Sequence, residues 1–561
     1  MTTLARLFVL TLALAAVGAV RHLPVVPVVT PLAAAEQPDI LFISIDTLRA
    51  DRMDVYGGGH ANSPALQAFA MDAVVFDRAF GQATWTLPGH ATLLTGLYPS
   101  RHLVFEDHST IRTGLPYLPA LLKAQGYRTV GWASHIRFDG YGFERGFDEF
   151  KVASGGPRSP TPEPRVQDGL AWLRPRMARV DKRPVFAFLH LYDVHGYSYQ
   201  PEVADLLDAA GGLTVSQLSP ANLERVRQAY DARLRQVDGA LDTLFQQMRA
   251  QGTYTPSLII VTTDHGHAFG EEGQWGHGNV AWAVTRIPLL IKFPGQRMAG
   301  TRLPGVVEGQ IDLLPTVLTE IGASIPSVDG RPLQRLLGGR SAAGNIAVTE
   351  STLAGSWQVP SYSAAVQEQD ARYTWSLDER TGQVSSASSP ASSEVSRRLA
   401  RELEGFFRHK SSLLVTVAWP QGVVPCPITF DPVYGFSVAS STRDVRLTAD
   451  GVKRTLMPTT PKAATVVQVE LRPSASRFHV STPQTGNCRP PISVRNLSAK
   501  SERWLVDGSK NSLFATIEEL RGLAAKAGPS PLLWIPSNER VTPTTLTKEQ
   551  LEVLRSLGYI K

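Results

Sequence analysis

Short, continuous apolar runs recur over roughly the first 340 residues of the chain, and longer amphipathic segments separate them. A run that is apolar at every position and too short for a helix is typical of a strand buried on both faces of a sheet. On this basis we expect strands at Asp39–Ile45, Thr129–Ala133, Pro184–Leu191, Ser257–Thr263 and Ile287–Phe293.

Two of the segments between these runs have helical spacing. Leu115–Gln125 is expected to form a helix that stops at Gly126, and Asn222–Gln251 a longer one that ends at Gly252. Glycine is common just after helices because it accepts the left-handed backbone that closes them. Strands that alternate with helices predict an α/β fold, in which a mostly parallel, doubly wound sheet carries helices on both faces.

The pattern changes beyond residue 383. Residues 384–393 are rich in Ser and Ala, which predicts a linker, and a short helix is expected at Glu394–Phe407. From Leu413 to about Val494, short β-type runs are broken by Pro and Gly, which predicts a smaller C-terminal β-rich module, a small sandwich. The predicted divisions are an α/β catalytic domain over 38–383, the linker and short helix over 384–410, and the β-rich module over 411–500.

The first 35 residues have the features of an export signal. Arg6 gives a short positive region, Leu7–Val20 is almost unbroken apolar sequence, and Ala33-Ala34-Ala35 offers a small-residue cleavage site. The long distance from the apolar run to Ala35 leaves an uncleaved N-terminal anchor as the alternative. We therefore expect an exported protein, periplasmic or at the cell surface, with membrane contact only through such an anchor.

Composition narrows the class of protein. Of the 561 residues, 43% are hydrophobic and 19% charged, which is ordinary for a globular chain. The net charge of +6 is spread thinly, without a dense Lys/Arg run, so nucleic acid is not expected as a partner. Cys426 and Cys488 are the only cysteines. In an oxidising compartment their pairing would contribute about 4 kcal/mol; two unpaired thiols are the alternative.

Polar side chains follow three of the predicted strands, at the edge where an open α/β sheet places its site. These residues are Asp46 after the first strand, Asp193 and His195 after Pro184–Leu191, and Asp264 and His265 after Ser257–Thr263. Carboxylates with imidazoles and no sulfur suit Zn²⁺ or Mn²⁺ better than Ca²⁺. The sequence therefore predicts a divalent metal site, with one ion expected and two conceivable. Taken alone, Asp46 fits a helix N-cap better than a metal ligand.

One segment, Thr84-Trp85-Thr86-Leu87-Pro88-Gly89-His90 with Leu94-Thr95-Gly96, resembles the nucleophile segment of sulfatases, within the alkaline phosphatase superfamily. Pro88 and Leu94-Thr95-Gly96 keep the family spacing. Thr86 stands where sulfatases carry the residue that is oxidised to formylglycine, and His90 stands where they carry Arg. Because a Thr Cβ bears a methyl group, its oxidation yields only a ketone, so the usual sulfatase chemistry is excluded.

The resemblance extends to Asp264-His265-Gly266, to His277-Gly278 a dozen residues on, and to the final 25 or so residues. It implies that Asp46, Thr86, Asp264 and His265 bind the metal, and that the C-terminal segment 535–561 returns to the catalytic domain. Thr47 replaces the second Asp of the family, which argues against a calcium cage. His195 and His277 are expected to contact the ester or, with Asp193, to hold a second ion; His190 is interpreted as a structural strand residue.

These features predict a metal-dependent enzyme that cleaves or transfers phosphate-type esters through Thr86, with His195, His277 and His90 also catalytic. The substrate is expected to be a small-molecule, glycan or lipid ester. Hydrolysis of sulfate esters without formylglycine is the first alternative. The second is a non-catalytic binding protein on the same fold, against which the set of Asp and His residues argues.

Overall fold

A computed structural model describes residues 37–410 apart from nine gaps. After residue 410 it describes mainly the backbone of short strands, the last of which ends at Ile535. The gaps are residue 60, 105–109, 154–164, residue 180, 209–217, 338–344, 352–360, 379–383 and 390–392. The predicted signal segment 1–35, both cysteines and most of the C-terminal segment 535–561 lie outside the described residues.

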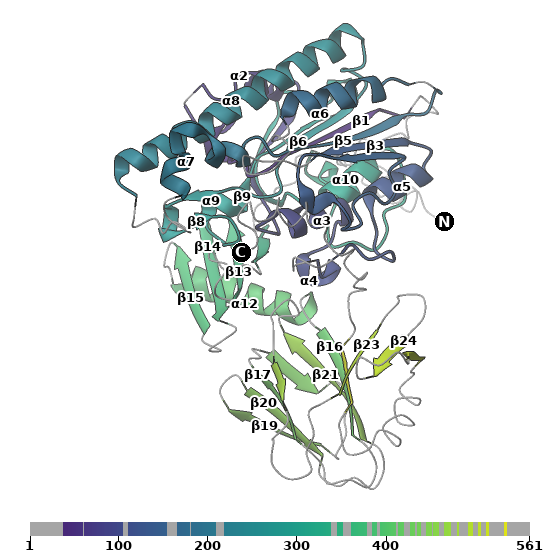
Figure 1. The fold of residues 1–561 in the computed structure, drawn as a ribbon, viewed down its shortest axis with the longest axis vertical. Helices are drawn as coiled ribbons and strands as arrows, with labels where there is room; N and C mark the ends of the chain where they lie inside the picture. Colours follow the sequence, from purple (N-terminus) through teal and green to yellow (C-terminus); the bar gives the residue numbers. More distant parts are fainter. Residues whose placement is uncertain are drawn as a thin grey trace, which may run out of the picture. The chain divides into compact units, whose positions relative to one another are not determined.

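A mixed, mostly parallel sheet of nine strands forms the centre of the part of the chain that is described (Figure 1). Its three middle strands, β6, β1 and β5, run parallel and are all buried. The order across the sheet is β11 (Arg302–Glu308), β2 (Val74–Phe80), β10 (Leu289–Lys292), β6 (Leu258–Thr262), β1 (Ile40–Ile45), β5 (Val185–Leu191), β3 (Arg128–Ala133) and β4 (Glu149–Val152), with β9 (Arg286–Ile287) paired to β2.

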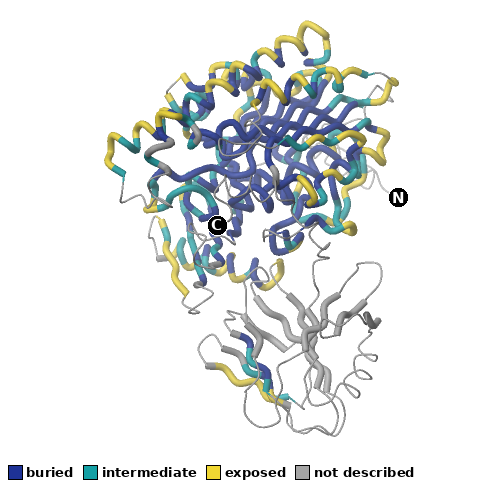
Figure 2. Tube along the Cα trace, viewed as in Figure 1, coloured by how far each residue is buried: buried dark blue, intermediate teal, exposed yellow. Residues whose placement is uncertain are grey.

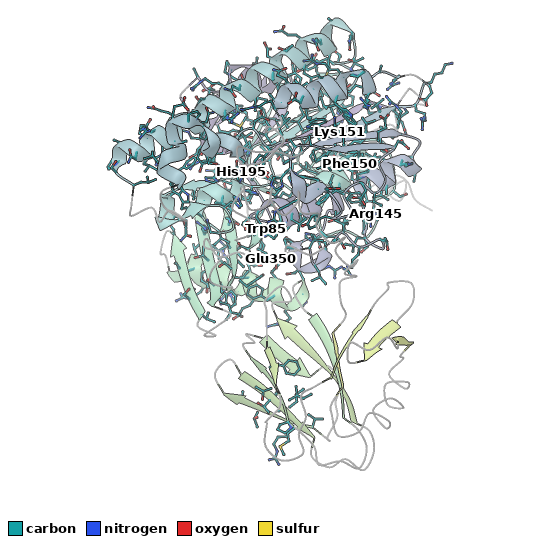
Figure 3. The ribbon with its side chains drawn as sticks, viewed as in Figure 1. Trp85, Arg145, Phe150, Lys151, His195 and Glu350 are labelled. Atoms are coloured by element: carbon teal, nitrogen blue, oxygen red, sulfur yellow. The ribbon has the colours of Figure 1, made fainter. Side chains whose placement is uncertain are left out.

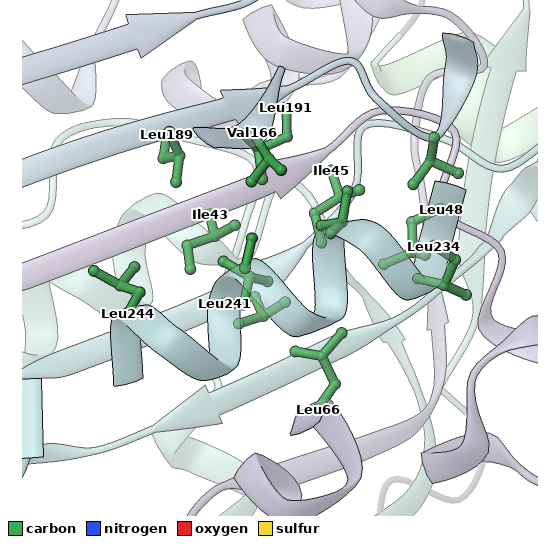
Figure 4. Close-up of a cluster of buried hydrophobic side chains, with 14 of the residues drawn as sticks. Ile43, Ile45, Leu48, Leu66, Val166, Leu189, Leu191, Leu234, Leu241 and Leu244 are labelled. Carbon is green, nitrogen blue, oxygen red and sulfur yellow. The ribbon is translucent and has the colours of Figure 1, made fainter. Parts of the chain in front are cut away.

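Helices cover both faces of this sheet, so the predicted doubly wound architecture is confirmed. On one face, Ile43 and Ile45 of β1 pack with Leu234 and Leu241 of the long helix α8 (Pro220–Ala250), as Figure 4 shows. Helices α2 (Pro64–Ala70) and α6 (Val166–Leu173) lie on the same face. The opposite face is covered by α3 (Thr86–Thr95), α5 (Leu118–Ala124) and α10 (Leu313–Glu320).

Burial follows this layering. The three central strands β6, β1 and β5 are buried throughout, whereas exposed residues lie on the outer sides of the helices and at the edge strands β4 and β11 (Figure 2). The remaining short helices are α4 (Pro99–His102), α7 (Pro201–Asp208), α9 (Trp282–Thr285) and α11 (Gln334–Leu337). No helix among the described residues is long and apolar enough to cross a membrane.

The predicted strands and helices of the α/β domain agree with the structure with one exception. The run Ile287–Phe293 is not a single strand, because Pro288 has no N–H to donate and separates β9 from β10. Both short strands still pair with β2. β9 and β10 each run antiparallel to it. The single apolar run therefore supplies two antiparallel neighbours of an otherwise mostly parallel sheet.

A second sheet of four strands follows the α/β part, and helix α12 (Ser393–His409) packs against it. The predicted linker 384–393 is wrong in its first half, since Val384–Ser389 forms β15, an edge strand paired only with β14. Its Ser and Ala residues are exposed, so the backbone pairing and not side-chain burial makes it a strand. The other strands are β12 (Ala347–Ser351), β13 (Ser361–Glu368) and β14 (Ala371–Asp378).

The expected C-terminal β-type runs form strands, in two antiparallel-rich sheets of seven and four members among the described residues. The seven-stranded sheet includes β24–β26, so its strands continue past the predicted boundary at residue 500. These strands are β16 (Leu413–Trp419), β17 (Ile428–Asp431), β18 (Gly435–Val438), β19 (Val445–Asp450), β20 (Lys453–Pro458), β21 (Thr465–Arg472), β22 (His479–Ser481), β23 (Ile492–Asn496), β24 (Arg503–Val506), β25 (Ser512–Phe514) and β26 (Leu532–Ile535).

Candidate active site

The candidate site lies at the carboxyl ends of the three central strands. Asp46 directly follows β1, and its backbone N–H donates to the carbonyl of Leu191, the last residue of β5. Asp264 comes two residues after β6, on the other side of β1. Three adjacent parallel strands thus end together, which brings carboxylates from distant parts of the sequence to one edge of the sheet.

Thr86 is the first residue of helix α3. Its side chain is 2% exposed, and its Oγ1 donates to Oδ2 of Asp46 across 3.4 Å. The first N–H groups of a helix have no intrahelical acceptor and lie at the positive end of the dipole, where an anion is stabilised. Gly89 lets this helix approach the sheet, because a Cβ there would lie 3.0 Å from Cβ of Asp264.

Two glutamines hold the loop that precedes Thr86. Oε1 of Gln310 accepts from the N–H groups of Gln82 (2.6 Å) and Ala83 (3.0 Å), and its Nε2 donates to the carbonyl of Asp264. Gln82 in turn accepts from the backbone N–H groups of Gln310 and Ile311. This buried pair ties the loop before Thr86 to the backbone of a predicted metal ligand, and the sequence interpretation did not identify it.

Asp46, Asp264 and His265 form a group able to hold a metal ion, since one ligand atom from each lies within 4.8 Å of the others. Nε2 of His265 lies 3.3 Å from Oδ2 of Asp264 and 3.9 Å from Oδ1 of Asp46. All three atoms are buried without a hydrogen bond. Nδ1 of His265 lies 2.9 Å from the Gly266 carbonyl, which fixes its proton there and turns the Nε2 lone pair to the carboxylates. These orphaned atoms fit a divalent cation.

Electrostatics point the same way. Burial, and then the charge of Asp264, raise the pKa of Asp46 to about 6. Burial also disfavours the charged form of Asp264, but His265 and His90 outweigh it and hold the pKa of Asp264 below its ordinary value. Burial would lower the pKa of His265, yet the carboxylates of Asp264 and Asp46 raise it to about 9. Two buried carboxylates this close together are therefore stabilised by a positive charge between them.

His195 and His277 meet on the more open side of the cluster. Both are half-buried, and their Nε2 atoms lie 3.2 Å apart, so one of them donates to the other. His195 begins a short turn of helix after β5, and it is labelled with Trp85 in Figure 3. The His277 ring centroid is 4.6 Å from that of His265. Burial lowers the pKa of both His195 and His277, which favours neutral imidazoles.

His267 extends this row of imidazoles. Its Nε2 lies 2.9 Å from the hydroxyl of Tyr197, and its ring centroid is 6.0 Å from that of His277. The ring is not a member of either group of described residues that could share an ion. His267 therefore lies beside the cluster, in contact with Tyr197.

His90 and His190 lie beneath the carboxylates. Nδ1 of His90 is 2.9 Å from the carbonyl of Thr86 and 3.5 Å from Oδ2 of Asp264. Nε2 of His190 is 3.3 Å from Oδ2 of Asp46. The interpretation of His190 as a structural strand residue is therefore incomplete. The sequence did contain a signal for this contact. His190 is the single polar residue of the apolar strand Val185–Leu191, so its imidazole needs a polar partner inside the fold.

One expectation about ligands does not match the geometry. Val194 has helical backbone angles, so the chain bends between Asp193 and His195, and Oδ1 of Asp193 accepts from the N–H of Val166 at the start of α6. Asp193 belongs to neither group of described residues that could share an ion, so the second-ion set of Asp193, His195 and His277 is not assembled. Thr47 has φ of 58° and its hydroxyl donates to the Asp46 carbonyl, so it supplies no substitute ligand.

Comparison with known proteins gives consistent matches. The family model described as Sulfatase matches residues 38–323. An ulvan-active sulfatase of Formosa agariphila is 26% identical over 336 residues, which are 54% of this chain and 65% of that protein. The chain spans only 65% and 60% of the lengths of two such curated relatives.

Solved structures show the same fold. A phosphonate monoester hydrolase from Silicibacter pomeroyi superposes with a TM-score of 0.52 at 20% identity, covering 67% of this chain and 96% of its own. A 2-O glycosaminoglycan sulfatase, BT1596, superposes with a TM-score of 0.53 at 16% identity, covering 67% and 93%. At these identities the likeness concerns the fold alone.

Proposed function

The chain belongs to the sulfatase family, and from this premise we propose that it is an exported, metal-dependent hydrolase of anionic esters with Thr86 as its nucleophile. The observation that carries the proposal is the contact of the Thr86 hydroxyl with Asp46, at the edge of a buried group of two carboxylates and an imidazole with unsatisfied ligand atoms. Buried polar atoms are normally hydrogen-bonded, so orphans in one place favour a ligand there.

Asp46, Asp264, His265 and Thr86 would hold the ion. A divalent cation supplies positive charge that lowers the pKa of a neighbouring hydroxyl and offsets charge on the ester oxygens. Two carboxylates and one imidazole favour Zn²⁺ or Mn²⁺ over Ca²⁺, which takes six to eight oxygen ligands. The Thr47 side chain, which donates to the Asp46 carbonyl, adds no oxygen to the set.

Thr86 performs the substitution. Its O–H points at Oδ2 of Asp46, which accepts the proton as Oγ1 attacks the phosphorus of the ester. A bond forms between Oγ1 and phosphorus, the bond to the alcohol oxygen breaks, and the free N–H groups of the α3 N-terminus bind the transferred group. Water then attacks the same phosphorus and releases Thr86; an alcohol in place of water would make the enzyme a transferase.

His195 and His277 serve the leaving group. They lie on the more open side of the cluster, where a substrate can enter, and they share one hydrogen bond between their Nε2 atoms. An N–H of this neutral pair can donate a hydrogen bond to the departing alcohol oxygen and stabilise the negative charge that develops on it. His90, which contacts the Thr86 carbonyl, positions the helix that carries the nucleophile.

Phosphorus esters are the proposed substrates because Thr86 keeps a hydroxyl that cannot become an aldehyde. The fold of a phosphonate monoester hydrolase supports this choice. Sulfate esters are the second candidate, supported by relatives named as ulvan-active sulfatase and choline-sulfatase. A small-molecule or glycan ester fits both candidates.

The test compares wild-type protein with Thr86→Ala and Thr86→Ser on p-nitrophenyl phosphate, bis-p-nitrophenyl phosphate and p-nitrophenyl sulfate, with Zn²⁺, Mn²⁺ or Ca²⁺ added. Loss of the hydroxyl should reduce turnover of the phosphorus esters by about 10³-fold or more, since a nucleophile is removed outright. Thr86→Ser, which keeps the hydroxyl, should retain turnover. A Thr86→Ala protein that keeps wild-type activity would exclude Thr86 as nucleophile, and turnover of the sulfate ester alone would favour the second candidate.

A further inference from the structure

His190 is a buried histidine within the central sheet. It is the sixth residue of β5, directly opposite Ser44 of β1, and its side chain is fully buried. Its ring packs edge-on against that of His90, with centroids 4.7 Å apart, and against Phe138 at the same distance. The ring therefore has little freedom to turn, and its Nε2 is held 3.3 Å from Oδ2 of Asp46.

The hydrogen-bond partners of this ring determine where its proton lies. A carboxylate oxygen only accepts, so an ionised Asp46 requires the proton on Nε2 of His190. Nδ1 of His190 is buried and has no hydrogen-bond partner. A proton on Nδ1 would leave a buried N–H donor without an acceptor, which costs about 1–3 kcal/mol of stability. A buried lone pair without a donor is tolerated more readily. Nε2 is consequently a donor, and its lone pair is not available to an ion.

The same reasoning separates His190 from a metal ligand. His265 has its Nδ1 at a carbonyl oxygen and a bare Nε2 toward the carboxylates, as ligating histidines do. His90, His190 and Asp264 are also close enough to share an ion. However, Nδ1 of His90 faces the Thr86 carbonyl and its Nε2 lies 3.0 Å from Ser44 Oγ, so both its nitrogens are engaged. A second ion at this place would require both rings to give up hydrogen bonds.

The two oxygens of Asp46 then have different tasks. Oδ2 faces both Thr86 Oγ1 at 3.4 Å and His190 Nε2 at 3.3 Å, while Oδ1 is buried without a hydrogen bond and faces His265. We propose that His190 is a positioning residue whose Nε2–H fixes the Asp46 carboxylate so that Oδ1 is presented to the cation. The proposal rests on cation binding by the site as proposed above.

Removal of the donor should weaken binding of the ion. Without His190, the carboxylate of Asp46 can rotate, and loss of a partner that orients a ligand typically costs about 10- to 100-fold in metal affinity. His190→Leu should show this loss. His190→Gln, whose amide N–H can reach Oδ2, should stay within a few-fold of wild type.

The experiment measures Zn²⁺ affinity of the full chain by competition with a chromophoric chelator, and the visible absorption of the Co²⁺-loaded protein. His102→Leu is the matched control, because His102 is a fully buried imidazole that contacts Thr92 on another element. The control should lose stability without losing Zn²⁺ affinity. The Co²⁺ spectrum of His190→Gln should match wild type, since the ligand set is unchanged.

Each result discriminates. Wild-type affinity in folded His190→Leu would overturn the positioning role alone. A His190→Gln protein that binds as weakly as His190→Leu, with a shifted Co²⁺ spectrum, would overturn it in favour of direct ligation. Wild-type protein that binds neither Zn²⁺ nor Co²⁺ would overturn the proposed function, and this assignment with it.

Discussion

The pair Gln82 and Gln310, which holds the loop before Thr86, allows a direct test of how the candidate site is supported. Replacement of Gln310 by Ala leaves three buried backbone groups without their partner, namely the N–H groups of Gln82 and Ala83 and the carbonyl of Asp264. A buried group that loses its partner costs about 1–3 kcal/mol. We therefore expect Gln310→Ala to lower the free energy of unfolding by about 3 kcal/mol or more.

The same change should act on catalysis beyond its effect on stability. The loop before Thr86 and the backbone of Asp264 lose their common tie, so the proposed nucleophile Thr86 and the proposed metal ligand Asp264 are free to shift apart. A misplacement of about 1 Å can cost about 100-fold in rate. Gln310→Glu keeps an acceptor for the two N–H groups but loses the donor to the Asp264 carbonyl, so its loss of stability should be smaller than that of Gln310→Ala.

The assays are urea unfolding followed by fluorescence, and steady-state kinetics on the best ester at a temperature where each variant is folded. Gln334→Ala is the control, since Gln334 of α11 is half-buried and donates to the Thr316 carbonyl of α10, and it makes no hydrogen bond to the described residues of the loop before Thr86 or to Asp264. It should cost about 1 kcal/mol and leave kcat unchanged. A Gln310→Ala protein as stable and as active as this control would refute the reasoning.

Two further predictions follow from packing and charge. Gly89→Ala should reduce kcat by about tenfold or more with the fold retained, because the new Cβ would lie 3.0 Å from Asp264 and push α3 away from it. Gly239→Ala is the matched control, since a Cβ at Gly239 has no atom within 4 Å. Equal kinetics for the two variants would contradict the role of Gly89. Burial, and then the charge of Asp312, raise the pKa of Glu308 to about 8. Because the folded pKa lies above the ordinary value of 4.5, the stability contributed by protonated Glu308 is present at low pH and lost as the pH rises toward and through 8. Glu308→Gln should therefore gain in melting temperature relative to wild type as the pH rises from about 4.5 to about 8, and a constant difference over that range would exclude this titration.

Most of the α/β elements follow from local sequence, because a strand buried on both faces has to be apolar throughout and a surface helix has to be amphipathic. The runs around Phe42, Phe188 and Ile260 are of this kind, and all three are central strands. The exceptions are cases where pairing overrides composition. Val384–Ser389 is a strand only because β14 offers it a free edge, and Pro288 divides a run by removing one N–H.

Asp46, Asp264 and His265 were candidates from the sequence because they follow recognisable apolar strands, and Thr86 because its segment resembles the nucleophile segment of sulfatases. Only the tertiary structure decided which further side chains join them. Asp193 turns to the N–H of Val166 because the chain bends at Val194, whereas His190 reaches Asp46 because parallel pairing sets β5 beside β1. A sequence records the order of residues along each strand, but the neighbours of a side chain across a sheet depend on register and on turns, which are fixed only when the strands pack.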